Sequence, residues 1–168
     1  MKKVYLDYAA TTPLDPRVLG AMMPYLEEKF GNPSSVHFWG QEAREAIEKA
    51  RKQVAKALGC KSSEVYFTGT TTVSDNLAIQ GVARAAKKAG RGNHLITSAV
   101  EHHAVLDTCQ ALEKEGFKLT VLPVDKQGMV DPKDVGKAIN DKTVLVTIMY
   151  ANNEVGTVQP IKEIADIV

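Results

Sequence analysis

Residues 64–81, EVYFTGTTTVSDNLAIQG, place a strand-like run, a hydroxyl-rich turn and a helix in direct succession. The β-branched and aromatic run Val65-Tyr66-Phe67 predicts a short buried strand. Apolar residues then recur at helical spacing and predict a helix with one apolar face, formed by Leu77, Ala78, Val82, Ala85 and Ala86.

The turn between them, Thr68–Thr72, is the first candidate site. A helix start leaves several backbone N–H groups without partners, and the helix dipole makes that end partly positive. Hydroxyls and amides gathered there predict a site for a phosphate or another anion. A single threonine that caps the helix, with the others filling a tight turn, accounts for the same residues. The residue types alone favour the anion site and the simple helix cap about equally.

Helices and strands alternate along the rest of the chain. The Asp-Pro pairs at 15–16 and 131–132 are typical of helix starts. We expect the first helix to end near Gly31, and a longer helix over the following residues to end at Gly59. Further helices are predicted at about 103–116 and from Pro160 onward.

Three runs downstream of the turn read as strands, at 94–98, 118–123 and 143–149. The last is nearly continuous in apolar residues, which suits a strand covered on both faces. The alternation predicts an α/β fold, with a mainly parallel sheet and helices on both faces. Ligands in such folds bind beyond the carboxyl ends of the strands. The loops expected there are 68–72, 98–103 and 150–155.

Composition narrows the function classes. The chain has 168 residues, with 21 basic and 20 acidic side chains and a net charge of +1, so electrostatics favours neither nucleic acid nor an anionic membrane as a partner. Cys60 and Cys109 are too few for a disulfide framework or a thiolate metal site. We expect no metal site, and the absence of an apolar leader or span predicts a cytoplasmic protein.

Five motifs in a fixed order resemble one enzyme family over all 168 residues. They are YLDYAATTP at 5–13, GNPSS at 31–35, SDNLAI at 74–79, EH followed by AVL at 101–106, and NNEVG at 152–156. The chain resembles the cysteine desulfurases of the NifS/IscS type, in the class V aminotransferase group of pyridoxal-phosphate enzymes. The resemblance implies the large domain of a fold-type I transferase, truncated to its N-terminal part. It implies an N-terminal arm over 1–15, and the cofactor-binding domain over 16–168.

The resemblance also assigns roles to individual residues. Thr71 and Thr72 fall where family members hold the phosphate of pyridoxal 5'-phosphate. His102 falls where a family histidine stacks on the cofactor ring and is proposed to act in proton transfer. Without the resemblance, the residue type alone favours a capping or solvent-facing histidine. Asn153 falls where a family asparagine contacts the ring oxygen. Its neighbours Asn152, Glu154 and Gly156 are expected to shape the loop, and His103 to be structural.

The implied reaction removes sulfur from L-cysteine, giving L-alanine and an enzyme persulfide for iron–sulfur or thiolation pathways. It requires a lysine that holds the cofactor as a Schiff base and a cysteine that takes the sulfur. No Ser-His-Lys triplet occurs in the chain, and Cys60 and Cys109 are interpreted as structural, so we expect the 168 residues alone to be inactive. The implied partners are a sulfur-acceptor or scaffold protein and a second subunit. A truncated sheet also predicts self-association.

One segment departs from the family pattern. Family members read TSGATESDN where this chain reads TGTTTVSDN over residues 68–76. If the usual glycine position needs a positive φ, Thr70 would be strained there. Val73 replaces a carboxylate that favours a helix start. Three alternatives therefore remain: a class V aminotransferase, a selenocysteine lyase, or an inert truncated domain.

Overall fold

The computed structural model describes residues 3–168, and the chain forms two compact units that meet at Phe67 and Thr68. The first unit holds α1 (Pro16–Glu27), α2 (Phe38–Leu58) and a short 3-10 turn at Ser62–Glu64. The second holds all the strands. The predicted division into an arm over 1–15 and a domain over 16–168 stays a prediction.

Local signals fixed the helix ends of the first unit, with one exception. Asp15 caps α1 and accepts the N–H of Arg17, as predicted, and Gly59 takes the left-handed conformation that ends α2 (φ 69°). The expectation that α1 runs to a left-handed Gly31 is wrong, because the helix ends at Glu27. Gly31 has another role: a Cβ there would lie 2.1 Å from the backbone oxygen of Trp39, so only glycine permits this approach.

The predicted strand at Val65–Phe67 is also wrong. Val65 is buried, but Tyr66 and Phe67 are 76% and 53% exposed, and the segment pairs with no strand among residues 3–168. Its backbone is held by a side chain instead: the guanidinium of Arg51 donates to the Val65 carbonyl at 2.6 Å and lies over the Phe67 ring. A strand-like sequence needs a neighbouring strand to form a ladder, and none is available here.

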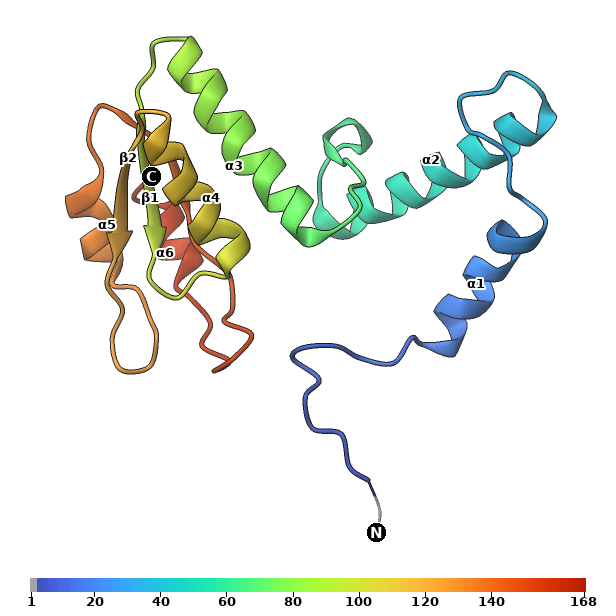
Figure 1. Cartoon of the computed structure of the whole chain (residues 1–168), viewed down its shortest axis with the longest axis horizontal. Helices are drawn as coiled ribbons and strands as arrows, with labels where there is room; N and C mark the ends of the chain where they lie inside the picture. Colours follow the sequence, from blue (N-terminus) through green and yellow to red (C-terminus); the bar gives the residue numbers. More distant parts are fainter. Residues whose placement is uncertain (1–2) are drawn as a thin grey trace. The chain divides into compact units, whose positions relative to one another are not determined.

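The second unit is an α/β layer structure, as predicted. Its order is α3 (Thr71–Lys88), β1 (His94–Ser98), α4 (His103–Lys114), β2 (Lys118–Leu122), α5 (Pro132–Ala138), β3 (Thr143–Thr147) and α6 (Ile161–Ala165). The three strands are parallel in the order β2-β1-β3. Figure 1 labels the neighbouring strands β2 and β1. β1 is buried throughout, whereas β3 is only half-buried, which corrects the expectation that β3 is covered on both faces.

Each face of the sheet carries its own apolar core. Leu95 of β1 packs with residues of α3 and α4, and with Phe117 just before β2: Ile79, Ala83, Val105, Cys109, Leu112 and Phe117. Ile96, the next residue, points to the other face and packs with Leu122, Val130, Val135 and Ile164 around α5 and α6. Helices therefore cover both faces, and β1 is the strand around which both cores form.

The amino end of β1 is fixed by a buried histidine. His94 contacts the hydroxyls of Thr120 on β2 and Thr143 on β3, each at 2.8 Å, and the Asn140 amide at 3.0 Å. Burial, followed by the nearby charge of Lys118, lowers the pKa of His94. A neutral imidazole therefore joins all three strands at the edge opposite their carboxyl ends.

Two further observations concern the described residues as a whole. No helix within residues 3–168 combines the length and apolarity needed to span a membrane. Large apolar side chains are widely exposed, including Val18, Met22 and Leu26 along α1. That exposure agrees with the predicted self-association, which stays a prediction.

Candidate functional site

The start of α3 is built by Thr70. Its backbone is extended (φ −154°, ψ 163°), and its Oγ1 accepts the N–H of Val73 at 3.2 Å. Because φ is negative, the strain considered for a threonine at this position does not arise. The hydroxyls of Thr68 and Ser74 lie 2.6 Å apart and tie the turn to the helix. Thr70 is therefore the helix cap, and Thr71 and Thr72 are the first two helical residues.

The turn suits an anion. The backbone N–H groups of Thr71 and Thr72 have no acceptor among residues 3–168. No acidic residue lies in the first turn of α3, where Val73 occupies the position of the family's carboxylate. Two unsatisfied amides at the positive end of an 18-residue helix, flanked by hydroxyls, fit the phosphate of an ester.

His102 forms the cap of α4. Its Nδ1 accepts the N–H of Ala104 at 3.0 Å, and its side chain is exposed. This bond requires an unprotonated Nδ1, so the neutral ring carries its proton on Nε2. Capping and a role at a reactive centre are compatible, because they use different ring nitrogens. The adjacent His103 points to solvent, and its Nδ1 lies 3.4 Å from an Asp107 carboxylate oxygen, so its expected structural role stays a prediction.

Asn153 lies in a loop that its neighbour Asn152 organises. The Oδ1 of Asn152 accepts the N–H groups of Glu154 and Val155, and its Nδ2 donates to the Val100 carbonyl at 3.1 Å. Gly156 takes a positive φ of 78°. The prediction that these neighbours shape the loop is confirmed for Asn152 and Gly156, and for Glu154 it stays a prediction. The Asn153 side chain is left exposed, and among residues 3–168 its Nδ2 donates only to the carboxylate of Glu154, at 2.9 Å.

Glu101 is a site residue to which the sequence analysis gave no role. Its Oε1 accepts the Ser98 hydroxyl at 2.7 Å and the Met149 N–H at 2.9 Å. It thereby joins the loop that follows β1 to the loop that follows β3. Burial raises the pKa of Glu101, and the charge of Asp75 raises it further. The sequence did contain a signal for this role: Glu101 is a charged residue between a buried strand and a helix cap. A carboxylate in such a place needs hydrogen-bond partners.

These contacts bring three segments to one edge of the sheet. Bonds from Asn152 to Val100 and from Glu101 to Met149 join the loops that carry His102 and Asn153. α3 and α4 run alongside each other in the same direction, since Asn76 meets Thr108, each five residues after the start of its helix, and Arg84 meets Glu115 further along both. The start of α3 therefore lies at the same edge as the start of α4.

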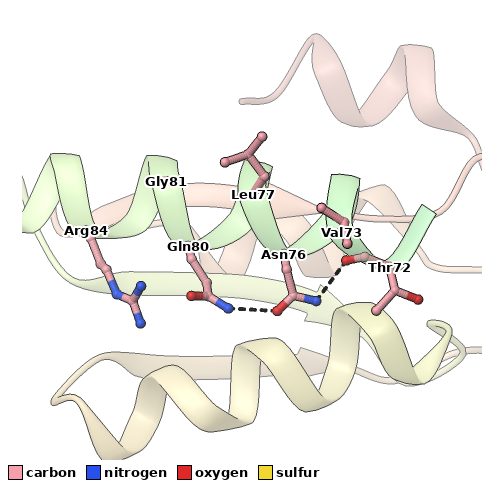
Figure 2. Close-up of a pocket in the computed structure, with 7 residues that line it drawn as sticks. All are labelled: Thr72, Val73, Asn76, Leu77, Gln80, Gly81 and Arg84. Carbon is pink, nitrogen blue, oxygen red and sulfur yellow. Dashed lines mark hydrogen bonds between the residues drawn. The ribbon is translucent and has the colours of Figure 1, made fainter. Parts of the chain in front are cut away.

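A groove of about 650 Å³ follows α3 from this edge. All seven of its lining residues come from that helix, from Thr72 to Arg84 (Figure 2). Neither His102 nor Asn153 lines it, so the groove is an open helix face that touches the candidate site only at Thr72. Within residues 3–168, no three His, Cys, Asp or Glu side chains are grouped to hold a metal ion.

The sequence and the fold are those of a known enzyme family. The family model described as aminotransferase class V matches residues 4–168, so the chain belongs to that family. A solved structure titled NifS-like protein superposes with a TM-score of 0.95 at 45% identity, over 99% of this chain and 45% of its own. Another, titled SspA in complex with cysteine, has a TM-score of 0.91 at 43% identity, over 97% and 46%.

Curated relatives give the particular group to which the chain is similar. A protein named cysteine desulfurase IscS from Dictyoglomus turgidum is 57% identical over 166 residues, and one of the same name from Methanosarcina thermophila is 54% identical. The match covers 99% of this chain in both cases, but 42% and 41% of the relatives. The chain thus spans about two fifths of the length of the relatives it matches.

Proposed function

We propose that this chain forms the phosphate-binding and ring-facing part of a cysteine desulfurase that uses pyridoxal 5'-phosphate. The observation that carries the proposal is the pair of unsatisfied amides at Thr71 and Thr72, at the same sheet edge as the His102 and Asn153 loops. The relatives named cysteine desulfurase, and a structural neighbour titled as a complex with cysteine, support the substrate.

Each candidate residue has a physical task toward the cofactor. Thr71 and Thr72 would hold the phosphate through their amides and hydroxyls, at the positive end of α3. Asn153 would donate from Nδ2 to the ring oxygen, for which its amide must leave the Glu154 carboxylate. Bound pyridoxal phosphate supplies an electron sink for bond breaking at the amino acid's α-carbon.

His102 is proposed as the proton-transfer residue. Its Nδ1 is engaged by the Ala104 N–H, so Nε2 is the atom that holds and delivers the proton. The bond to Ala104 also orients the ring, as a base needs an orienting partner to act repeatedly at one place. Glu101 keeps the loop before His102 against the loop after β3 through the Met149 N–H.

The reaction of the whole enzyme can be tested in a chimera. The matched 166 residues of the Dictyoglomus turgidum relative would be replaced by this chain, and alanine and sulfide formed from L-cysteine under reductant would be measured. We expect both products in equal amounts. Transfer of the amino group to a keto acid, without sulfide, would instead favour a class V aminotransferase. Release of selenide from L-selenocysteine, without sulfide from L-cysteine, would favour a selenocysteine lyase.

Matched variants make this test specific. His102→Gln should abolish most turnover, by roughly 10²–10⁴-fold for loss of a general acid–base group. His103→Gln, on the exposed neighbour, should change it little. A folded chimera that binds the cofactor but forms no alanine would refute the proposed reaction, as would equal effects of the two histidine variants.

A further inference from the structure

A series of polar contacts joins the first turn of α3 to the cap of α4, with the single hydrogen of the Thr108 hydroxyl shared between two acceptors. The Nδ2 of Asn76 donates to the Thr72 carbonyl at 2.9 Å. Its Oδ1 accepts the Thr108 hydroxyl at 2.9 Å, and that hydroxyl also lies 2.8 Å from the Ala104 carbonyl. The N–H of Ala104 in turn donates to His102 Nδ1. The series therefore begins at one proposed phosphate ligand and ends at the proposed proton-transfer residue.

Asn76 is placed for this link by the phase of its helix. Figure 2 shows Asn76 and Gln80 on the side of α3 that faces α4, with Leu77 pointing away. Gln80 donates to the same Asn76 Oδ1 at 2.7 Å, so that oxygen accepts two bonds and the amide is held in one orientation. Thr108 is only 6% exposed, so the shared hydroxyl is largely screened from water.

Apolar packing between α3 and α4 does not by itself set how far one helix is displaced along the other. Ile79 and Ala83 contact Val105, Cys109 and Leu112 through side chains whose contacts are not directional. Hydrogen bonds are directional, and a shift of one helix would break the Asn76–Thr108 bond. The polar link therefore helps to set the offset between the two helix starts, together with the Arg84–Glu115 ion pair further along.

We propose that Thr108 and Asn76 are positioning residues, which fix the distance between the phosphate-binding turn at Thr72 and the His102 ring. This inference rests on the proposed function, because it assigns the two helix starts to opposite ends of one ligand. Neither residue needs to touch that ligand. Their effect is expected only where phosphate and ring must be held at the same time.

The test compares ligands that use both ends of the site with ligands that use one. Dissociation constants of the full chain would be measured for pyridoxal phosphate, for pyridoxal and for inorganic phosphate. In Thr108→Val, which removes the hydroxyl at constant shape, we expect affinity for pyridoxal phosphate to fall about fivefold, as for one net hydrogen bond. Affinity for pyridoxal and for inorganic phosphate should change less than about twofold. Thr108→Ser, which keeps the hydroxyl, should restore the affinity for pyridoxal phosphate.

Thr120→Val is the matched control. It also removes one threonine hydroxyl bonded to another side chain, His94, but at the opposite edge of the sheet. Thr120→Val should change the affinities for pyridoxal phosphate, pyridoxal and inorganic phosphate by the same factor. Hydrogen exchange at the Ala104 amide gives a readout without ligand, and we expect it to quicken about fivefold in Thr108→Val and not in Thr120→Val.

The outcomes separate the two proposals. Equal losses for all three ligands, the same pattern in Thr120→Val, or no rescue by Thr108→Ser would overturn the positioning role while the proposed function stands. If the unsubstituted chain binds none of the three ligands saturably, the proposed cofactor site fails and the positioning role fails with it. Hydrogen exchange then still reports whether the link between the helices exists.

Discussion

Replacement of Glu101 is the sharpest test of how the candidate site is held together. Glu101→Ala removes the acceptor of the Ser98 hydroxyl and of the Met149 N–H. Bonds to an ionised acceptor contribute roughly 1.5–3 kcal/mol each, so the gross loss is about 3–6 kcal/mol. The burial that raises the pKa of Glu101 offsets part of this loss. We expect the second unit to lose about 2–4 kcal/mol of unfolding free energy at pH 7.

Glu101→Gln separates the acceptor from the charge. Its amide oxygen can accept both bonds, and the cost of burying a carboxylate near Asp75 disappears. Neutral hydrogen bonds are about half as strong as charged ones, so the two effects nearly cancel, and we expect a change within about 1 kcal/mol at pH 7. Glu113→Gln, on an exposed position of α4, is the control and should stay within about 0.5 kcal/mol.

The raised pKa of Glu101 also predicts in which direction the stability difference between the two chains changes with pH. The pKa of Glu101 in the fold lies above its ordinary value of 4.5, so the folded chain binds this proton more tightly than the unfolded chain. The associated stability is fully present below about pH 4.5 and is lost as pH rises through the raised pKa. The unfolding free energy of the unsubstituted chain, minus that of Glu101→Gln, should therefore fall between pH 4 and 7.

Urea unfolding followed by circular dichroism, with hydrogen exchange at the Met149 amide, measures these effects. Fluorescence of Trp39 is unsuitable, since Trp39 belongs to the first unit. The reasoning is refuted if Glu101→Gln destabilises as much as Glu101→Ala, or if the difference from the unsubstituted chain does not change with pH. The first result would mean that the carboxylate charge, not its acceptor geometry, joins the two loops. The second would mean that folding does not raise the pKa of Glu101.

Two further predictions concern buried groups outside the proposed site. The lowered pKa of His94 means that its contribution to stability is present above about pH 6.5 and is lost as pH falls through the lowered value. The free energy of unfolding in urea should therefore decrease from pH 7 to pH 5, and His94→Gln should remove this decrease. A decrease removed instead by His103→Gln would contradict the assignment to His94. Burial raises the pKa of the Cys109 thiol to about 11, so little of it is a reactive thiolate at pH 8. Iodoacetamide at pH 8 should therefore label only the exposed Cys60 in the native chain, and both cysteines in urea. Mass spectrometry measures the labelling. Fast native labelling of Cys109 would show that its helix face is open.

Elements with local signals were predictable from the sequence. The bounds of β1 and the starts of α1, α4 and α5 were predicted correctly, and caps such as Asp15 and Asp131 act within one helical turn. The layer order followed from the alternation of strands and helices. Val65–Phe67 failed for the opposite reason, since strand formation depends on a partner that a local pattern does not contain.

The links within the candidate site were not predictable in the same way. Glu101 and Met149 are 48 residues apart, and Asn76 and Thr108 are 32 apart. Their contacts depend on the offset between packed elements, which hydrophobic periodicity does not specify. Thr71, Thr72, His102 and Asn153 were named through family resemblance, and their cofactor roles stay proposals.

The altered turn before α3 is compatible with phosphate binding on physical grounds. The usual family pattern has a glycine at position 70, but the extended backbone of Thr70 needs no glycine and uses its hydroxyl to cap Val73. Loss of a first-turn carboxylate at Val73 costs the helix about 0.3–1 kcal/mol of dipole stabilisation. It also removes a negative charge that would compete for the same positive helix end. With valine at position 73, no carboxylate of the chain's own first turn competes with a bound anion for the Thr71 and Thr72 amides. The departure from the family pattern therefore does not count against the site.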